Sequence, residues 1–174
     1  MQGLPFPDAS FDFVYIRFMY AVIPATMWAT VMQEIFRITR PGGWVESLES
    51  LPYAVKQRDG MATIINWFSD LLRHRGVDPL VALKISHLMQ ESGLMQITTR
   101  EIGPTKNETQ GLEEKRQKRE SGLGLIETMH DPIIAAGITT LEIYEAAAEK
   151  ARIELQATDK IGGFSTYVNT GQRP

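Results

Sequence analysis

Apolar residues along this chain follow two periodicities, one typical of strands and the other of helices. Residues 11–18 (FDFVYIRF) form a nearly continuous apolar run, which predicts a strand covered on both faces, as in a parallel sheet. Residues 25–40 repeat apolar positions every three or four residues, and Pro-Gly-Gly at 41–43 ends that helix. Residues 44–49 (WVESLE) predict a second strand. This order is a βαβ unit and indicates an α/β fold.

The remaining pattern predicts helices and strands up to the end of the chain. The charged stretch 105–121 is expected to be an exposed loop or a solvated helix. The other expected elements are helices at 59–75 and 79–92, a strand at 94–103, a helix at 122–136 broken near Pro132, a helix at 141–157 and a strand at 164–170.

Composition narrows the class of protein. The chain has 174 residues, 43% hydrophobic and 22% charged, which fits one globular domain. Its net charge of -3 gives no electrostatic footprint for nucleic acid or an anionic membrane, and it has no cysteine. The sequence shows no transmembrane run and no signal peptide. We therefore expect a cytoplasmic or nuclear protein with neither nucleic acid nor a membrane as partner.

Four motifs together resemble the second half of class I S-adenosylmethionine (SAM)-dependent methyltransferases. They are LPFPDASFDFVYIR, EIFRITRPGGWVE, LMQESGLMQITTREIGP and FSTYVNTGQRP. The segment RHRGVDPLVA is similar to fungal methyltransferases related to regulators of secondary metabolism. The resemblance implies the C-terminal half of a Rossmann-like fold, with about four strands in the family order 4-5-7-6. The last strand would be antiparallel, with helices on both faces of the sheet.

The resemblance also implies a domain that begins part-way through the family fold. Residues 1–174 would form a single partial domain, with 105–160 as a cap or insertion between the last two strands. Two family features are not found: the Gly-rich turn after a first strand and the acidic residue after a second. The nearest Gly pair, Gly122 and Gly124, follows a charged stretch rather than a strand. We therefore expect a truncated chain that lacks a complete SAM site by itself.

The function implied is SAM-dependent methyl transfer to an unidentified small-molecule or protein acceptor, with SAM as the cofactor. One alternative is a non-catalytic interaction module. In that case the first strand would be an open edge that pairs with a partner or with a second copy as a homodimer. An unrelated small α/β binding protein is a third reading.

The resemblance places candidate site residues at the carboxyl ends of the first two strands, where ligands of open α/β sheets lie. The cofactor-binding candidates are Tyr15, Ile16, Arg17 and Phe18. The substrate-pocket candidates are Met19, Tyr20, Glu46 and Glu49.

Each polar candidate has a structural alternative. Arg17 either holds a carboxylate of a ligand or pairs with a surface acid. Tyr20 either lines the acceptor pocket or is a buried structural tyrosine. Asp8 and Asp12 are expected to be structural, as a turn former and as the residue at the strand entry. The three histidines are far apart in sequence, so no metal site is predicted and no catalytic residue is assigned.

Overall fold

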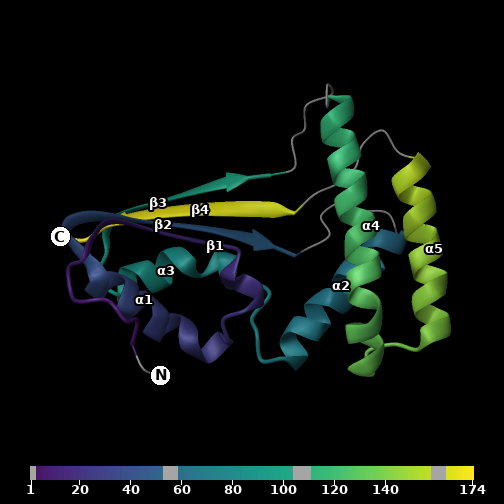
Figure 1. Cartoon of the computed structure of the whole chain (residues 1–174), viewed down its shortest axis with the longest axis horizontal. Coiled ribbons are helices and arrows are strands. Elements are labelled where there is room, and N and C mark those ends of the chain that lie inside the picture. The colour runs from purple at the N-terminus through teal and green to yellow at the C-terminus, as the bar shows by residue number, and fades with distance from the viewer. Residues whose placement is uncertain (1–2, 53–58, 104–110, 158–163) are drawn as a thin grey trace. The chain divides into compact units, whose positions relative to one another are not determined.

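The computed structural model describes residues 3–52, 59–103, 111–157 and 164–174. The chain divides into two compact units, and each contains segments that are distant in sequence. Unit 1 comprises Met1–Leu51, Gly76–Ile102 and Thr166–Pro174, and unit 2 comprises Pro52–Arg75 and Gly103–Ser165. The sheet belongs to unit 1, and unit 2 is built from helices (Figure 1).

Unit 1 is a four-stranded sheet in the order β1-β2-β4-β3. The strands are β1 (Phe11–Arg17), β2 (Thr39–Leu51), β3 (Met95–Ile102) and β4 (Ser165–Gln172), and the helices are α1 (Trp28–Ile38) and α3 (Ile85–Glu91). Three short 3-10 turns complete it: η1 (Met19–Ala21), η2 (Ala25–Met27) and η3 (Val81–Leu83). The helix predicted at 79–92 is therefore shorter and begins with a separate turn.

Strand directions follow from the residue pairs. β1 and β2 are parallel, with Val14 opposite Val45, whereas β3 and β4 are antiparallel. The start of β2 lies beside the end of β4, because the Arg173 N–H donates to the Gly43 carbonyl. The end of β2 lies beside the start of β4, where the hydroxyls of Ser50 and Thr166 are 3.1 Å apart. β4 is thus antiparallel to both neighbours, and the predicted order 4-5-7-6 with an antiparallel last strand is confirmed.

Helices α1 and α3 lie together on one face of the sheet (Figure 1). The core beneath them consists of Trp28, Met32, Ile35, Val45, Val81, Ile85, Met89 and Leu94. Burial alternates along β1: Val14 and Ile16 pack against this core, whereas Phe13 and Tyr15 are 56% and 45% exposed. Within the described part of unit 1, β1 is therefore covered on one face, and the predicted cover on both faces is not seen there.

The junction of α1 with β2 differs from the sequence prediction. α1 ends at Ile38, and Pro41 to Gly43 already belong to β2. The strand begins earlier because Thr39 pairs with Phe11 of β1, while the Thr39 hydroxyl donates to the Ile35 carbonyl of the helix. A Cβ on Gly43 would lie 2.9 Å from the carbonyl oxygen of Asp12, so this close approach requires glycine.

Unit 2 contains α2 (Asp59–His74), α4 (Leu112–Ala135) and α5 (Leu141–Ala157). Their shared core comprises Met61, Ile64, Ile65, Leu71, Ile126, Ile133, Tyr144, Ala148, Ala151 and Leu155. The Glu154 carboxylate of α5 accepts the backbone N–H groups of Gly60 and Met61 at 2.9 and 3.1 Å. It therefore satisfies free donors in the first turn of α2.

Helix α4 differs from its prediction because it is continuous. Pro132 lies inside the helix without ending it, and Gly122 and Gly124 are also helical. The Gly pair therefore does not form a turn between a strand and a helix. The region predicted as a cap, 105–160, lies within unit 2, together with α2. Among the described residues no helix is long and apolar enough to cross a membrane.

Candidate functional site

The carboxyl end of β1 is a sharp turn. The strand ends at Arg17, and Phe18 then adopts the left-handed conformation, with φ 53° and ψ 29°. Such a φ is uncommon for a bulky residue and is kept where surrounding contacts fix the chain. One of these contacts is the Phe18 N–H, which donates to the Leu48 carbonyl of β2 at 2.9 Å. Met19 and Tyr20 follow in η1.

Glu49 holds this turn from the neighbouring strand. Its side chain is fully buried, and its two oxygens accept the backbone N–H groups of Met19 and Tyr20 at 3.1 and 2.9 Å. Burial raises the pKa of the Glu49 carboxyl, while the two N–H donors act in the opposite direction. The carboxylate thus fixes the position of the β1 turn.

Tyr20 shares the environment of Glu49. Burial raises the pKa of the Tyr20 phenol, and the nearby Glu49 carboxylate raises it further. Tyr20 and Met19 also pack against the core beneath α1 and α3. Three of the four predicted pocket residues, Met19, Tyr20 and Glu49, are therefore brought together.

The other candidates lie on two faces of the sheet. Tyr15 of β1 is opposite Glu46 of β2, and both lie on the face that α1 and α3 leave open. Ile16 lies on the other face, in the core. The Arg17 guanidinium is 5.7 Å from the centre of the Phe18 ring, which is 48% exposed. The predicted residues Tyr15 to Tyr20 are thus consecutive in the chain, but their side chains do not share one face of the sheet.

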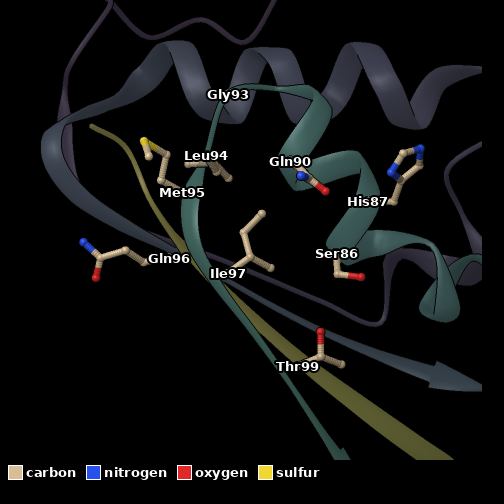
Figure 2. A pocket seen from close by; sticks show the side chains of 9 residues that line it. All are labelled: Ser86, His87, Gln90, Gly93, Leu94, Met95, Gln96, Ile97 and Thr99. Carbon is tan, nitrogen blue, oxygen red and sulfur yellow. The ribbon is translucent and has the colours of Figure 1, made fainter.

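A groove lies elsewhere in unit 1, between α3 and β3, with a volume of about 680 Å³ (Figure 2). Its walls are Ser86, His87, Gln90, Gly93, Leu94, Met95, Gln96, Ile97 and Thr99. None of the predicted site residues lines it. The sequence pattern did not indicate this groove, since its polar residues are dispersed over a helix and a strand.

A row of polar side chains, of which Ser47 and Asn169 are buried, crosses the sheet beside this groove. Counting along β2 and β4 from Gly43 and Arg173 places Ser47 opposite Asn169. The Thr99 hydroxyl donates to Asn169 Oδ1 at 2.7 Å. Within the described structure, Ser47 Oγ and Asn169 Nδ2 are buried without a hydrogen-bond partner. Buried groups of this kind are usually satisfied by ordered water.

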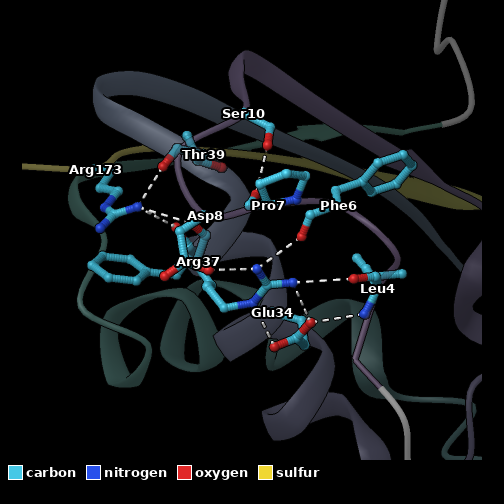
Figure 3. Close-up of polar contacts among 10 residues, drawn as sticks. Leu4, Phe6, Pro7, Asp8, Ser10, Glu34, Arg37, Thr39 and Arg173 are labelled. Carbon is cyan, nitrogen blue, oxygen red and sulfur yellow. Dashed lines mark hydrogen bonds and ion pairs between the residues drawn. The ribbon is translucent and has the colours of Figure 1, made fainter.

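The segment before β1 is fixed by Arg37 of α1 (Figure 3). The guanidinium donates to the carbonyls of Leu4 and Phe6 and to the carboxylates of Asp8 and Glu34. The Glu34–Arg37 pair lowers the pKa of the Glu34 carboxyl to about 2. The motifs LPFPD and EIFRITRP therefore contact each other, and Asp8 has the structural position that the sequence predicted.

Arg173 completes the same region from the end of β4. Its Nη1 donates to the carbonyls of Phe36, Arg37 and Thr39 at 3.1, 3.0 and 2.6 Å, and its guanidinium lies 4.6 Å from the centre of the Phe36 ring. These carbonyls are at the C-terminal end of α1, where cations are favourable. The charged residues nearest the two motifs thus hold the βαβ unit together.

The same βαβ unit is where the sequence matches known proteins. Residues 1–46 match a family described as a methyltransferase domain. Over this βαβ unit the chain is similar to methyltransferases. The chain is 49% identical over 47 residues to the demethylmenaquinone methyltransferase of Geobacillus kaustophilus, a match that covers 27% of this chain and 19% of that protein. It is 28% identical over 100 residues to the methyltransferase str3 of Strobilurus tenacellus, covering 55% of this chain and 35% of that one.

Solved structures show the same fold at low identity. The phosphoethanolamine N-methyltransferase 2 of Haemonchus contortus, in complex with phosphomonomethylethanolamine and S-adenosylhomocysteine, superposes with a TM-score of 0.51. The match has 16% sequence identity and covers 97% of this chain and 35% of that one. The matches to this chain therefore span about a fifth to a third of the length of these proteins. Among the described residues, no group of three or more His, Cys, Asp or Glu residues is placed to hold a metal ion.

Proposed function

We propose that this chain acts in SAM-dependent methyl transfer, as the C-terminal part of a methyltransferase, on an acceptor still to be identified. One observation carries the proposal. The βαβ unit that matches the methyltransferase domain joins the carboxyl ends of its two strands through Glu49, which binds the N–H groups of Met19 and Tyr20. Ligands of open α/β sheets lie at such strand ends.

The residues at this end suit the cofactor chemically. SAM supplies a methyl group on a positively charged sulfonium, from which a nucleophile displaces it. The rings of Tyr15 and Phe18 are 45% and 48% exposed, and aromatic surfaces attract such a cation. Arg17 can bind the carboxylate of an amino-acid group. Because methyl transfer depends mainly on alignment and water exclusion, a rigid turn contributes directly to it.

We further propose that the 174-residue chain binds SAM only weakly by itself. Its candidates form one side of a site, and no described strand leads through a Gly-rich turn into a helix. Gly122 and Gly124 lie inside α4 instead. Glu49 does not add a free carboxylate, since both its oxygens already accept backbone N–H groups.

The test is an NMR titration of the ¹⁵N-labelled chain with SAM, and with ATP as an adenine control. We expect a dissociation constant of roughly 1 mM or weaker, with chemical-shift changes at the amides of Arg17 to Tyr20 for SAM. Arg17→Ala should weaken the response, whereas Arg100→Ala, at another exposed strand arginine, should leave it unchanged. Absence of shifts at this turn would contradict the proposed site. Micromolar affinity would contradict its incompleteness.

A further inference from the structure

The groove between α3 and β3 lies at the edge of the sheet opposite to β1, and residues of unit 1 alone form it (Figure 2). Its volume of about 680 Å³ is in the range of small-molecule sites. None of the residues proposed for methyl transfer lines it. A ligand bound in this groove would therefore serve a purpose separate from that reaction.

The connection from α3 to β3 holds the two walls of the groove in place. Gly93 has a φ of 99°, which favours glycine, and its N–H donates to the Gln90 carbonyl at 3.0 Å. The hydroxyl of the buried Ser92 donates to the Met89 carbonyl at 2.7 Å, and the Leu94 N–H donates to the same carbonyl at 3.1 Å. Because these bonds fix the connection, the groove is formed before a ligand enters it.

Thr99 presents a hydrogen-bond acceptor from the β3 wall. Its hydroxyl donates to Asn169 Oδ1 at 2.7 Å, and Asn169 is only 1% exposed. A hydroxyl oxygen whose proton is used in this way still has lone pairs, so toward the groove it accepts a hydrogen bond. Because Asn169 is buried in the sheet, the direction of the Thr99 hydroxyl is fixed.

Ser86 and Gln90 supply polar groups from the α3 wall. They are four residues apart, so they lie on one face of the helix, and both line the groove. In the described part of the chain neither side chain is hydrogen-bonded to another group. The Gln90 amide donates through nitrogen and accepts through oxygen, and a hydroxyl can do both. This wall therefore suits a ligand that both donates and accepts.

The residues that line the groove do not favour an ion. They include no Lys, Arg, Asp or Glu. Nε2 of His87 lies 3.3 Å from Oε1 of Glu91, so this imidazole is already engaged by a carboxylate of its own helix. The apolar part of the surface comes from Leu94, Met95 and Ile97. A carboxylate or phosphate would lose hydration here without gaining a lysine or arginine partner.

We propose that this groove binds a small neutral molecule that carries a carboxamide next to an apolar ring. Figure 2 shows the polar side chains of Ser86, Gln90 and Thr99 around that of Ile97. The ligand N–H groups donate to the Thr99 hydroxyl and the Gln90 side-chain oxygen, its carbonyl accepts from the Ser86 hydroxyl, and its ring packs on the apolar residues. The inference is independent of methyl transfer.

The test is an NMR titration of the ¹⁵N-labelled chain with benzamide, and with benzoate as a charged probe of similar shape. We expect saturable chemical-shift changes at the amides of Gln90, Ile97 and Thr99, with a benzamide dissociation constant of roughly 1–10 mM. Benzoate should bind at least roughly tenfold more weakly, because it is charged and has no donor. No saturable change at these amides, or equal affinity for the two probes, overturns the proposal.

Variants of the two walls give an independent readout. Gln90→Ala should weaken benzamide binding roughly fivefold, the factor expected for one lost hydrogen bond. The matched control is Gln33→Ala, which removes an exposed glutamine of α1 outside the groove and should leave the affinity unchanged. Thr99→Val keeps the side-chain shape but removes the acceptor, so it should also weaken binding. If its amide spectrum shows that Thr99→Val is unfolded, the comparison of the two glutamine variants decides, and equal affinities of these two overturn the proposal.

Discussion

The backbone N–H of Tyr20 donates to the Glu49 carboxylate at 2.9 Å, although Tyr20 follows the first strand and Glu49 is near the end of the second. Among the described residues Glu49 has no ion-pair partner, and a fully buried carboxylate of this kind is costly unless hydrogen bonds satisfy it. Two backbone donors perform this role here, since Met19 supplies the other. The turn after β1 therefore depends on the Glu49 carboxylate for its position, and the buried carboxylate depends on the N–H groups of this turn for its hydrogen bonds.

Glu49→Gln should lower the free energy of unfolding by about 1–2 kcal/mol at pH 7, since the new amide nitrogen cannot accept a hydrogen bond and one buried N–H loses its partner. Urea denaturation measures the change. Glu46→Gln, on the open face, is the matched control and should change stability by less than about 0.5 kcal/mol. Equal effects of the two substitutions would contradict the role given to Glu49.

The same residue should give stability a pH dependence of known sign. Burial raises the pKa of Glu49 in the folded chain above its ordinary value of 4.5, so the folded state binds its proton more tightly. The stabilisation that comes from Glu49 is complete below its pKa in the unfolded chain. It is lost as the pH rises through the pKa that Glu49 has in the folded chain. The advantage of the wild type over Glu49→Gln, measured by urea denaturation, should therefore shrink from acid to neutral pH. A stability advantage of the wild type that grows from acid to neutral pH would contradict this prediction.

Arg173→Ala should destabilise unit 1 by about 2 kcal/mol, because three carbonyls at the end of α1 lose a charged donor and Phe36 loses its stacked cation. Arg173→Lys keeps the charge but loses the planar guanidinium, so it should recover only part of this stability. Chemical denaturation of the three proteins should show the free energy of unfolding decreasing from the wild type to Arg173→Lys and then to Arg173→Ala. Indistinguishable Lys and Ala variants would show that the charge contributes nothing.

Arg37→Ala should release the segment before β1. The guanidinium binds the carbonyls of Leu4 and Phe6, and α1 itself holds the N–H groups of Ala9 and Ser10. Amide hydrogen exchange at Ala9 and Ser10 should become roughly tenfold faster, the factor expected for losing one ordinary hydrogen bond. Arg73→Ala, which removes an exposed ion pair in α2, is the control and should leave these amides unchanged.

Gly60→Ala should destabilise unit 2 by about 1–3 kcal/mol. A Cβ at this position would lie 2.5 Å from the backbone nitrogen of Ala151, which requires α2 and α5 to separate. Gly124→Ala is the opposite case, since nothing lies within 4 Å of its added Cβ and the site is helical. It should stabilise the chain by about 0.5–1 kcal/mol. Thermal denaturation should show a lower melting temperature for Gly60→Ala and a higher one for Gly124→Ala than for the wild type.

The strand order was predictable because four local motifs point to one family, although periodicity alone does not specify which strands are neighbours. Boundaries were less predictable where contacts distant in sequence decide them. Thr39 begins a strand rather than continuing a helix because Phe11 is its partner. Pro132 was expected to break its helix, but it lies near the end of α4, which continues through it to Ala135.

The strand end that carries the site candidates was predictable, but its geometry was not. The sequence placed Tyr15 to Tyr20 at a strand end, and the structure confirms that end. The sequence did not show that the Ile16 side chain packs in the core. The alternation of buried and exposed side chains along β1 can be recognised only once one face of the sheet is known to be open. Nor did it show that Glu49 binds backbone groups about 30 residues earlier in the chain. Which of these residues contact a cofactor or substrate stays a prediction.

The place of β4 between β2 and β3 has a consequence for biosynthesis. As the chain leaves the ribosome, β1 and β2 can pair with each other before β4 is synthesised. β3 emerges next but has no neighbour in the sheet until β4 is synthesised. The sheet therefore closes only after translation has passed residue 172, and until then β2 and β3 expose edges that a chaperone can bind.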